Sequence, residues 1–331
     1  MASLAEIRAK LLAAEKNKGG NREGGGDNAI YPFWNIPENT TATIRFLPDG
    51  NTANDFFWLE RQMIRIPFSG VKGADESKGV TVNVPCVEMW GQECPIHKEI
   101  RPWFKDASME DMARKYWKKR SYLFQGFVVD SPFSEDSTPE NPIRRFVINS
   151  SIYKIISAAL MDPDFGDNLP TDYDMGTDFR ITKTQKGQYA DYTTSGWARR
   201  ERSLDQAERD AIAEHGLYDL NDFMPKRPDE AALNAIFEMF EASVEGDLYD
   251  PDRFADYYRP YGVEAPSNSG GAKPAEAKQE SAAPAADPTP ATQQEAAPAP
   301  AADPTPAPAA DTGGKDAKDI LAAIRARKEA S

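Results

Sequence analysis

The chain has 331 residues, and its 39 Lys and Arg against 53 Asp and Glu give a formal net charge of −14 at pH 7. Its 6 Trp, 12 Tyr and 16 Phe all lie between residues 31 and 261, which leaves about 230 residues to form a folded core. The longest largely apolar run, residues 155–161, has seven residues, far below the roughly 18 that a membrane-spanning helix needs. Two cysteines cannot supply a disulfide framework. These features predict a soluble, intracellular, acidic protein with flexible ends.

Residues 1–28 are predicted to be an N-terminal arm that begins with a short amphipathic helix at 2–18. Glycines between residues 19 and 26 end the helix. A lone helix of this length is marginal in water, so the arm either docks on another surface or is a frayed terminus. The apolar residues at helical spacing are Leu4, Ile7, Leu11 and Leu12.

Alternating polar and apolar residues predict β-strands through the first part of the core, residues 29–203. Helices are expected at 109–119 and 151–161. Short strands with interposed helices are typical of an α+β domain built around a small β-barrel or sheet, which is the fold that we predict. The expected strands are 41–48, 56–66, 80–84, 122–129, 145–148 and 179–184, the last followed by a hairpin turn.

Residues 204–263 are predicted to be an acidic helical segment, since 204–253 hold 14 Asp and Glu against 4 Lys and Arg. A helix begins near Pro228, with acidic residues in its first turn. The segment could compete with nucleic acid for a basic groove, dock partner proteins, or be an ordinary acidic appendage.

Residues 264–314 contain ten prolines between 266 and 308 and predict an Ala/Pro-rich disordered linker. Residues 315–331 predict a short basic amphipathic helix. Its Ile-Arg-Ala-Arg at 324–327 is similar to the Ile-Arg-Ala-Lys at 7–10. Either both helices dock on a similar kind of surface, or two Ala-rich helices are alike by chance.

Residues suited to catalysis are scarce, because the two histidines share no motif and no phosphate-binding loop occurs. We therefore expect no enzyme activity. Asp162, Asp164 and Asp167 could bind a metal in a metal-dependent nuclease, although an Asp-Pro-Asp loop is usually a turn. A single-stranded RNA-binding regulator is the other alternative.

Basic and aromatic residues are interleaved at 98–125, where eight Lys and Arg accompany four Asp and Glu, and again at 180–202. Cations follow phosphates, while exposed rings stack on unpaired bases at about 1–3 kcal/mol each. The pattern predicts sequence-tolerant binding of single-stranded nucleic acid; the alternative is that some rings belong to the core. The expected phosphate contacts are Arg45, Lys115, Lys118, Lys119, Arg120, Arg144, Arg145, Lys183 and Lys186. The rings expected to stack are Trp103, Tyr116, Trp117, Tyr122, Tyr189 and Tyr192.

Cys86, Cys94 and His97 have part of the spacing of a structural zinc site. A tetrahedral site needs a fourth ligand, and the other histidine, His215, is distant in sequence. Asp or Glu could serve, although less well. The alternative is a pair of reduced structural thiols.

Five segments carry a likeness to a known family: 42–48, 94–100, 118–129, 139–146 and 186–192. Taken in order, they resemble the single-stranded DNA-binding (helix-destabilising) proteins of T-even-type tailed phages, particularly their marine and cyanophage versions. The likeness covers roughly residues 1–203 and, with the marine versions, continues to about Tyr261.

The resemblance implies an oligonucleotide-binding (OB) β-barrel and cooperative coating of single strands through the N-terminal arm, with Arg8 and Lys10 in self-association. It also implies a C-terminal region that recruits replication and recombination proteins, and a role in phage DNA replication, recombination and repair in the cytoplasm of the infected bacterial host. Two features depart from the family pattern. His97 stands in place of a Cys and the upstream His is missing, and the tail ends on basic Arg325, Arg327 and Lys328 rather than on acidic residues.

Overall fold

The computed structural model describes residues 28–74, 78–135 and 137–263. The expected helices at 2–18 and 315–331, the linker at 264–314, and the self-association residues Arg8 and Lys10 lie outside these ranges.

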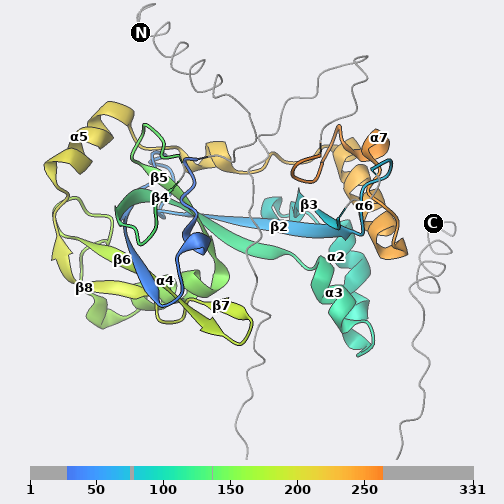
Figure 1. Cartoon of the computed structure of the whole chain (residues 1–331), viewed down its shortest axis with the longest axis horizontal. Coiled ribbons are helices and arrows are strands. Elements are labelled where there is room, and N and C mark those ends of the chain that lie inside the picture. The colour runs from blue at the N-terminus through green and yellow to red at the C-terminus, as the bar shows by residue number, and fades with distance from the viewer. Residues whose placement is uncertain (1–27, 75–77, 136, 264–331) are drawn as a thin grey trace, which may run out of the picture.

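Eight antiparallel strands form one sheet, and several of them are seen in Figure 1. The path through the sheet is β3-β2-β4-β1-β6-β7, while β5 pairs with β4 and β8 pairs with β6. A sheet accompanied by helices confirms the predicted α+β class. The described strands do not close into a barrel, so the OB barrel stays a prediction. The strands are β1 (Thr40–Leu47), β2 (Leu59–Phe68), β3 (Val80–Pro85), β4 (Lys119–Asp130), β5 (Arg144–Asn149), β6 (Gly176–Lys186), β7 (Tyr189–Asp191) and β8 (Gly196–Arg202).

Six α-helices accompany the sheet in the described part of the chain: α2 (Pro95–Ile100), α3 (Glu110–Tyr116), α4 (Ser150–Leu160), α5 (Gln206–His215), α6 (Glu230–Glu245) and α7 (Pro251–Phe254). Side-chain caps fix where the longer helices begin, because they satisfy backbone N–H groups at the helix start. Asn149 accepts from the N–H of Ile152, and Asp205 and Glu208 form a capping box on α5. The 3₁₀ turns are η1 (Phe33–Asn35), η2 (Val87–Trp90), η3 (Arg101–Lys105), η4 (Pro163–Phe165) and η5 (Leu220–Phe223).

Two large hydrophobic cores lie at opposite ends of β2, which runs between the two lobes seen in Figure 1. The strand core contains Phe46, Phe124 and Phe179. The helical core places Ile64 and Ile66 of β2 against helices α2, α3 and α6. Because β2 and β4 are paired from Leu59↔Leu123 to Met63↔Lys119, one continuous ladder joins the two lobes.

The acidic segment at 204–253 packs into these cores. Ile236, Met239 and Phe240 of α6 belong to the helical core, and Ala211 of α5 packs with Leu47 in a smaller third cluster. The exposed charged residues of α5 and α6 therefore lie on the outer faces of helices whose apolar faces are buried, whereas Asp250 is buried at the start of α7.

None of the helices within the described ranges is both long enough and apolar enough to cross a membrane.

Candidate functional site

Four of the six rings predicted to stack on bases are buried in the cores, so the prediction that they are exposed is wrong for them. α6 covers two of these rings: Trp103 packs on Phe240 with ring centroids 5.9 Å apart, and the Tyr116 hydroxyl lies 2.9 Å from Ser243 Oγ. Contacts from a helix more than a hundred residues later in the chain were invisible in the local pattern. The four rings are Trp103, Tyr116, Tyr122 and Tyr192.

Three arginines predicted to contact phosphate are also buried and hold the fold together. Arg45 lies 3.1 Å from Asp178 and donates to two backbone carbonyls, and burial lowers the pKa of its guanidinium despite that carboxylate. Arg144 pairs with Glu135, and the Arg145 guanidinium lies 3.7 Å from the centroid of the Phe223 ring. Since their charges are engaged internally, they do not present themselves to a phosphate.

The three consecutive basic residues at 118–120 lie in three different environments. Lys118 precedes β4, and Lys119 and Arg120 face opposite sides of the strand. Lys118 Nζ lies 2.6 Å from the Glu88 carboxylate, next to Cys86, Cys94 and His97, which we call the Cys/His cluster. Lys119 is directly opposite Met63 of β2. Arg120 is exposed on the other face of the strand and lies 3.5 Å from Glu60. The three cations therefore do not form a single track.

The remaining predicted residues are partly accessible. Lys115 is exposed, whereas Trp117 is half-buried and stacks on the His97 ring at 4.4 Å. Lys183 Nζ donates to the carbonyl of Trp34. Lys186 and Tyr189 face each other across the β6–β7 hairpin, where the Tyr189 ring is 51% exposed. This hairpin pair retains the predicted combination of a cation beside an open ring.

An aromatic patch, which we define as Phe56, Trp58, Tyr122 and Tyr153, lies where the strand core meets β2 and α4. Phe56 is 59% exposed, and its ring centroid is 4.9 Å from that of Trp58. Trp58 meets Tyr153 edge-on at 5.6 Å, and Tyr153 lies flat on Tyr122. The patch thus extends from the exposed Phe56 ring to the buried Tyr122 ring, which belongs to the strand core.

Arg120 is the cation of this patch, because it shares a strand face with Tyr122. Its backbone carbonyl accepts from Ser150 Oγ at 3.1 Å, which ties it to the start of α4, the helix that carries Tyr153. Burial raises the pKa of both Tyr122 and Tyr153, and the Glu60 carboxylate raises them further. The phenols are therefore uncharged at neutral pH and do not repel phosphate.

A second basic group, the basic strip of Arg61, Arg65 and Lys119, lies on the opposite face of β2 and β4. Arg61 is opposite Ser121, and its Nε donates to Ser121 Oγ at 3.3 Å. Arg61 is buried and Arg65 is half-buried, so this strip is less accessible than the aromatic patch.

Cys86, Cys94 and His97 come together beside the helical core, with ligand atoms that all lie within 4.8 Å of one another. Cys86 precedes η2, and Cys94 and His97 bracket the first turn of α2. Within the described residues, no other group of three or more His, Cys, Asp or Glu has such spacing. Both cysteines are buried and reduced.

The donor set fits a thiophilic metal such as zinc. The Cys86 sulfur accepts from the backbone N–H of Glu88, and the Cys94 sulfur accepts from those of Ile96 and His97. These N–H groups favour thiolates, the form that binds metal. Without a metal, the hydrogen bond with Cys94 and burial hold the pKa of the Cys86 thiol above its ordinary value, whereas the hydrogen bond with Cys86 lowers the pKa of Cys94. Burial lowers the pKa of His97, although Glu88 opposes the shift, so the imidazole is neutral as a ligand must be.

Glu88 connects this cluster to its surroundings. Its Oε1 lies 2.9 Å from His97 Nδ1, its Oε2 lies 2.6 Å from Lys118 Nζ, and Arg101 approaches at 3.3 Å. Burial alone would raise the pKa of Glu88, but Lys118 and His97 outweigh it and hold that pKa below its ordinary value. His97 Nε2 in turn accepts from the backbone N–H of Lys118 at 3.2 Å.

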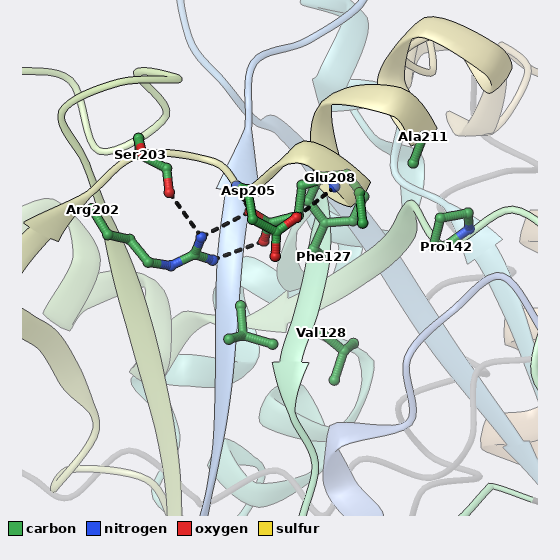
Figure 2. Close-up of a pocket in the computed structure, with 10 residues that line it drawn as sticks. Phe127, Val128, Pro142, Arg202, Ser203, Asp205, Glu208 and Ala211 are labelled. Carbon is green, nitrogen blue, oxygen red and sulfur yellow. Dashed lines mark hydrogen bonds and ion pairs between the residues drawn. The ribbon is translucent and has the colours of Figure 1, made fainter.

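A hollow lies between β4 and α5 (Figure 2), and the cation among its lining residues is less exposed than Arg120 of the aromatic patch. Its guanidinium, Arg202, is bound by both Glu208 oxygens at 2.8 Å, and this contact raises the pKa of Arg202. The apolar side chains around it include Phe127 and Val128. With its cation neutralised, the hollow does not have the chemistry of a phosphate site.

The family model described as "gp32 DNA binding protein like" matches residues 38–242. The chain belongs to this family. A search of curated proteins found no match. Membership in the gp32-like family supports single-stranded DNA binding, in agreement with the resemblance seen in the sequence, and the matched range contains both the aromatic patch and the Cys/His cluster.

Sequence reasoning did not select Phe56, Trp58, Arg61 or Arg65. The signal was present, since Phe56-Phe57-Trp58 precedes an alternating strand and only Phe57 is fully turned into the core. Arg61 and Arg65 are four residues apart, which places them on one face of a strand.

Proposed function

We propose that this gp32-like protein coats single-stranded DNA without sequence preference and without catalysing a reaction on it. Bases stack on the aromatic patch, and Arg120 neutralises the adjoining phosphate. Lys186 and Tyr189 of the hairpin supply a second contact of the same kind. Stacking is indifferent to base identity because every base has a π face, so such a surface tolerates any sequence.

The observation that carries this proposal is the position of Phe56. A phenylalanine that is 59% exposed and in ring contact with a tryptophan contributes little to the core. Arg120, which is exposed, lies on the same strand face as Tyr122 of the patch. Rings and a cation together are what an unpaired strand requires.

The test is Phe56→Ala, with Tyr257→Ala as matched control because Tyr257 is an exposed ring in the other lobe. Titration of a fluorescent oligo-dT should show binding weakened by about 1–3 kcal/mol for Phe56→Ala and unchanged for the control. Equal affinities for the two variants and the unmodified chain would remove the patch from the proposal.

The finer parts of the proposal concern the biological role. In it, residues 1–28 supply cooperative self-association, the C-terminal region recruits replication and recombination proteins, and the protein serves phage DNA replication and repair. Zinc at Cys86, Cys94 and His97 has a structural role, since the cluster is buried and holds the start of β4 through Lys118.

The two other candidate functions are separated by simple assays. Asp162 caps η4 by accepting from the N–H of Asp164, which is a turn role rather than a metal site. Cleavage of single strands in Mg²⁺ or Mn²⁺ would nevertheless favour a nuclease. Preference for poly-U over poly-dT in competition would favour an RNA-binding regulator.

A further inference from the structure

The Cys/His cluster supplies three ligands, and a structural zinc site needs a fourth. Glu88 is an acidic side chain that contacts one of these ligands, with Oε1 2.9 Å from His97 Nδ1. It comes from η2, the turn that connects the two cysteines, and its own backbone N–H donates to the Cys86 sulfur. Glu93, by contrast, is exposed and pairs with Lys98.

Two of the separations are close to those of a tetrahedral metal site. The ligand atoms that all lie within 4.8 Å of one another belong to Cys86, Cys94 and His97 without Glu88, so the Glu88 carboxylate has to move toward the sulfur atoms on binding. Bonds of about 2.0–2.3 Å to N, O and S ligands place neighbouring ligand atoms of such a site about 3.3–3.8 Å apart. His97 Nδ1 and Cys86 Sγ are already 3.8 Å apart. The Nδ1 and Oε1 atoms, now joined through a hydrogen bond, would have to separate by only about 0.5 Å.

Charge gives an independent argument. Two thiolates and one carboxylate around a divalent metal leave a net charge of −1, which is costly where side chains are buried. Lys118 compensates it: its Nζ lies 2.6 Å from the second Glu88 oxygen, and the two side chains are only 12% and 18% exposed. A lysine this shielded from solvent requires an anion nearby. Glu88 provides that negative charge through Oε2, while its Oε1 faces His97.

We propose that Glu88 is the fourth metal ligand, through Oε1, and that Lys118 is the counter-ion of the completed site. The inference rests on the proposed metal site. On binding, the two cysteine thiols release their protons to solvent, and the His97 proton moves from Nδ1 to Nε2, so the imidazole stays neutral and Nε2 gives up the hydrogen bond that it accepts from the Lys118 N–H. The hydrogen bond Nδ1–H···Oε1 is replaced by two bonds to the metal. Lys118 then remains on Oε2, so it acts as a positioning residue at the start of β4 and not as a phosphate contact.

The test uses the reduced full chain loaded with Zn²⁺ and titrated against a chromophoric chelator, compared with Glu88→Gln and with Glu93→Gln as control. Glu88→Gln should weaken zinc binding by at least roughly 10-fold, whereas the control should match the unmodified chain. Glu88→His restores a strong ligand and should bind zinc at least as tightly as the unmodified chain. X-ray absorption on the zinc-loaded chain should show two sulfur and two N/O neighbours. The visible absorption spectrum of a Co²⁺-loaded sample tests the coordination number separately and should be that of a four-coordinate site.

Equal zinc affinity in Glu88→Gln and Glu93→Gln would overturn the assignment. A loss in Glu88→Gln that Glu88→His does not recover would do the same, because it would indicate a structural effect. If the unmodified chain binds no zinc, the proposed metal site itself fails. Oligo-dT binding, measured on the same samples, reports separately on the DNA-binding proposal.

Discussion

The rings of Tyr122 and Tyr153 lie face to face, with centroids 3.4 Å apart and planes only 7° from parallel. This geometry resembles that of stacked bases, and it makes Tyr153 the outer, half-buried member of a pair whose inner member is part of the strand core. A base that reaches this surface finds a ring whose orientation is already fixed.

Replacement of Tyr153 by Leu should therefore weaken oligo-dT binding by about 1–3 kcal/mol, because the stacking face is lost. Tyr153→Phe should bind as the unmodified chain does, since the phenol hydroxyl has no part in stacking. Fluorescence anisotropy of a labelled oligomer measures both. Equal weakening in the two variants would show that the hydroxyl matters and the ring does not.

Salt dependence distinguishes the two faces of β4. Arg120→Gln should lower the slope of log K against log salt by about 0.7, the loss of one phosphate contact on a single strand. The same change was expected from the sequence for Lys119, but Lys119 lies on the opposite face, so Lys119→Gln should leave the slope unchanged. Arg253→Gln, an exposed arginine on α7, is the control. A lower slope for Lys119→Gln together with an unchanged slope for Arg120→Gln would place the DNA on the basic strip.

Arg45→Met should lower the free energy of unfolding by about 3 kcal/mol, since it leaves Asp178 and two carbonyls without their buried donor. Urea denaturation measures this. The folded variant should show an unaltered salt slope for oligo-dT, because the guanidinium is sealed from solvent. A reduced slope would restore Arg45 as a phosphate contact.

The ion pair between Lys72 and Asp250, with atoms 2.6 Å apart, makes stability depend on pH. The hydrogen bond from Lys72 holds the pKa of Asp250 below its ordinary value, so the carboxylate stabilises the fold above about pH 4. That contribution is lost as pH falls through the lowered pKa. Asp250→Asn, which can still cap α7, should unfold at lower urea than the unmodified chain at pH 7. The difference should shrink under acid conditions, and a constant difference would contradict this account.

Deletion of residues 1–18 tests the arm, which lies outside the described residues. Affinity for an oligomer long enough for one molecule should persist, while clustering on long poly-dT should disappear. Electron microscopy or a binding isotherm on poly-dT reports clustering. Its survival in the truncated chain would refute the role assigned to the arm.

The strands were predictable because their alternation is local. β1, β2, β3, β4, β5 and β6 all occur where alternating residues placed them, and α4 follows its apolar run. β8 was not predicted, because Arg199-Arg200-Glu201-Arg202 masks the alternation. α5 lies in the segment predicted to be helical, 204–263, but its bounds were not predicted because its apolar stripe is weak.

The site was harder, because exposure depends on contacts from distant parts of the chain. Tyr116 is sealed by Ser243 and Phe240, and Arg45 by the carbonyls of Asp172 and Arg202. No window of neighbouring residues contains those partners. The Cys/His grouping could be found because its members are close in sequence, and Glu88 was overlooked because a glutamate has no distinctive spacing.

The strand β2 has residues at both ends that belong to different hydrophobic cores. Phe57 and Trp58, just before its first residue, pack in the strand core, whereas Ile64, Ile66 and Phe68 pack in the helical core. Because β2 and the residues just before it contribute to both cores, unfolding of either lobe removes packing from the other, so we expect denaturation to proceed as one transition. A force that bound single-stranded DNA exerts on one lobe should likewise be transmitted to the other lobe through β2.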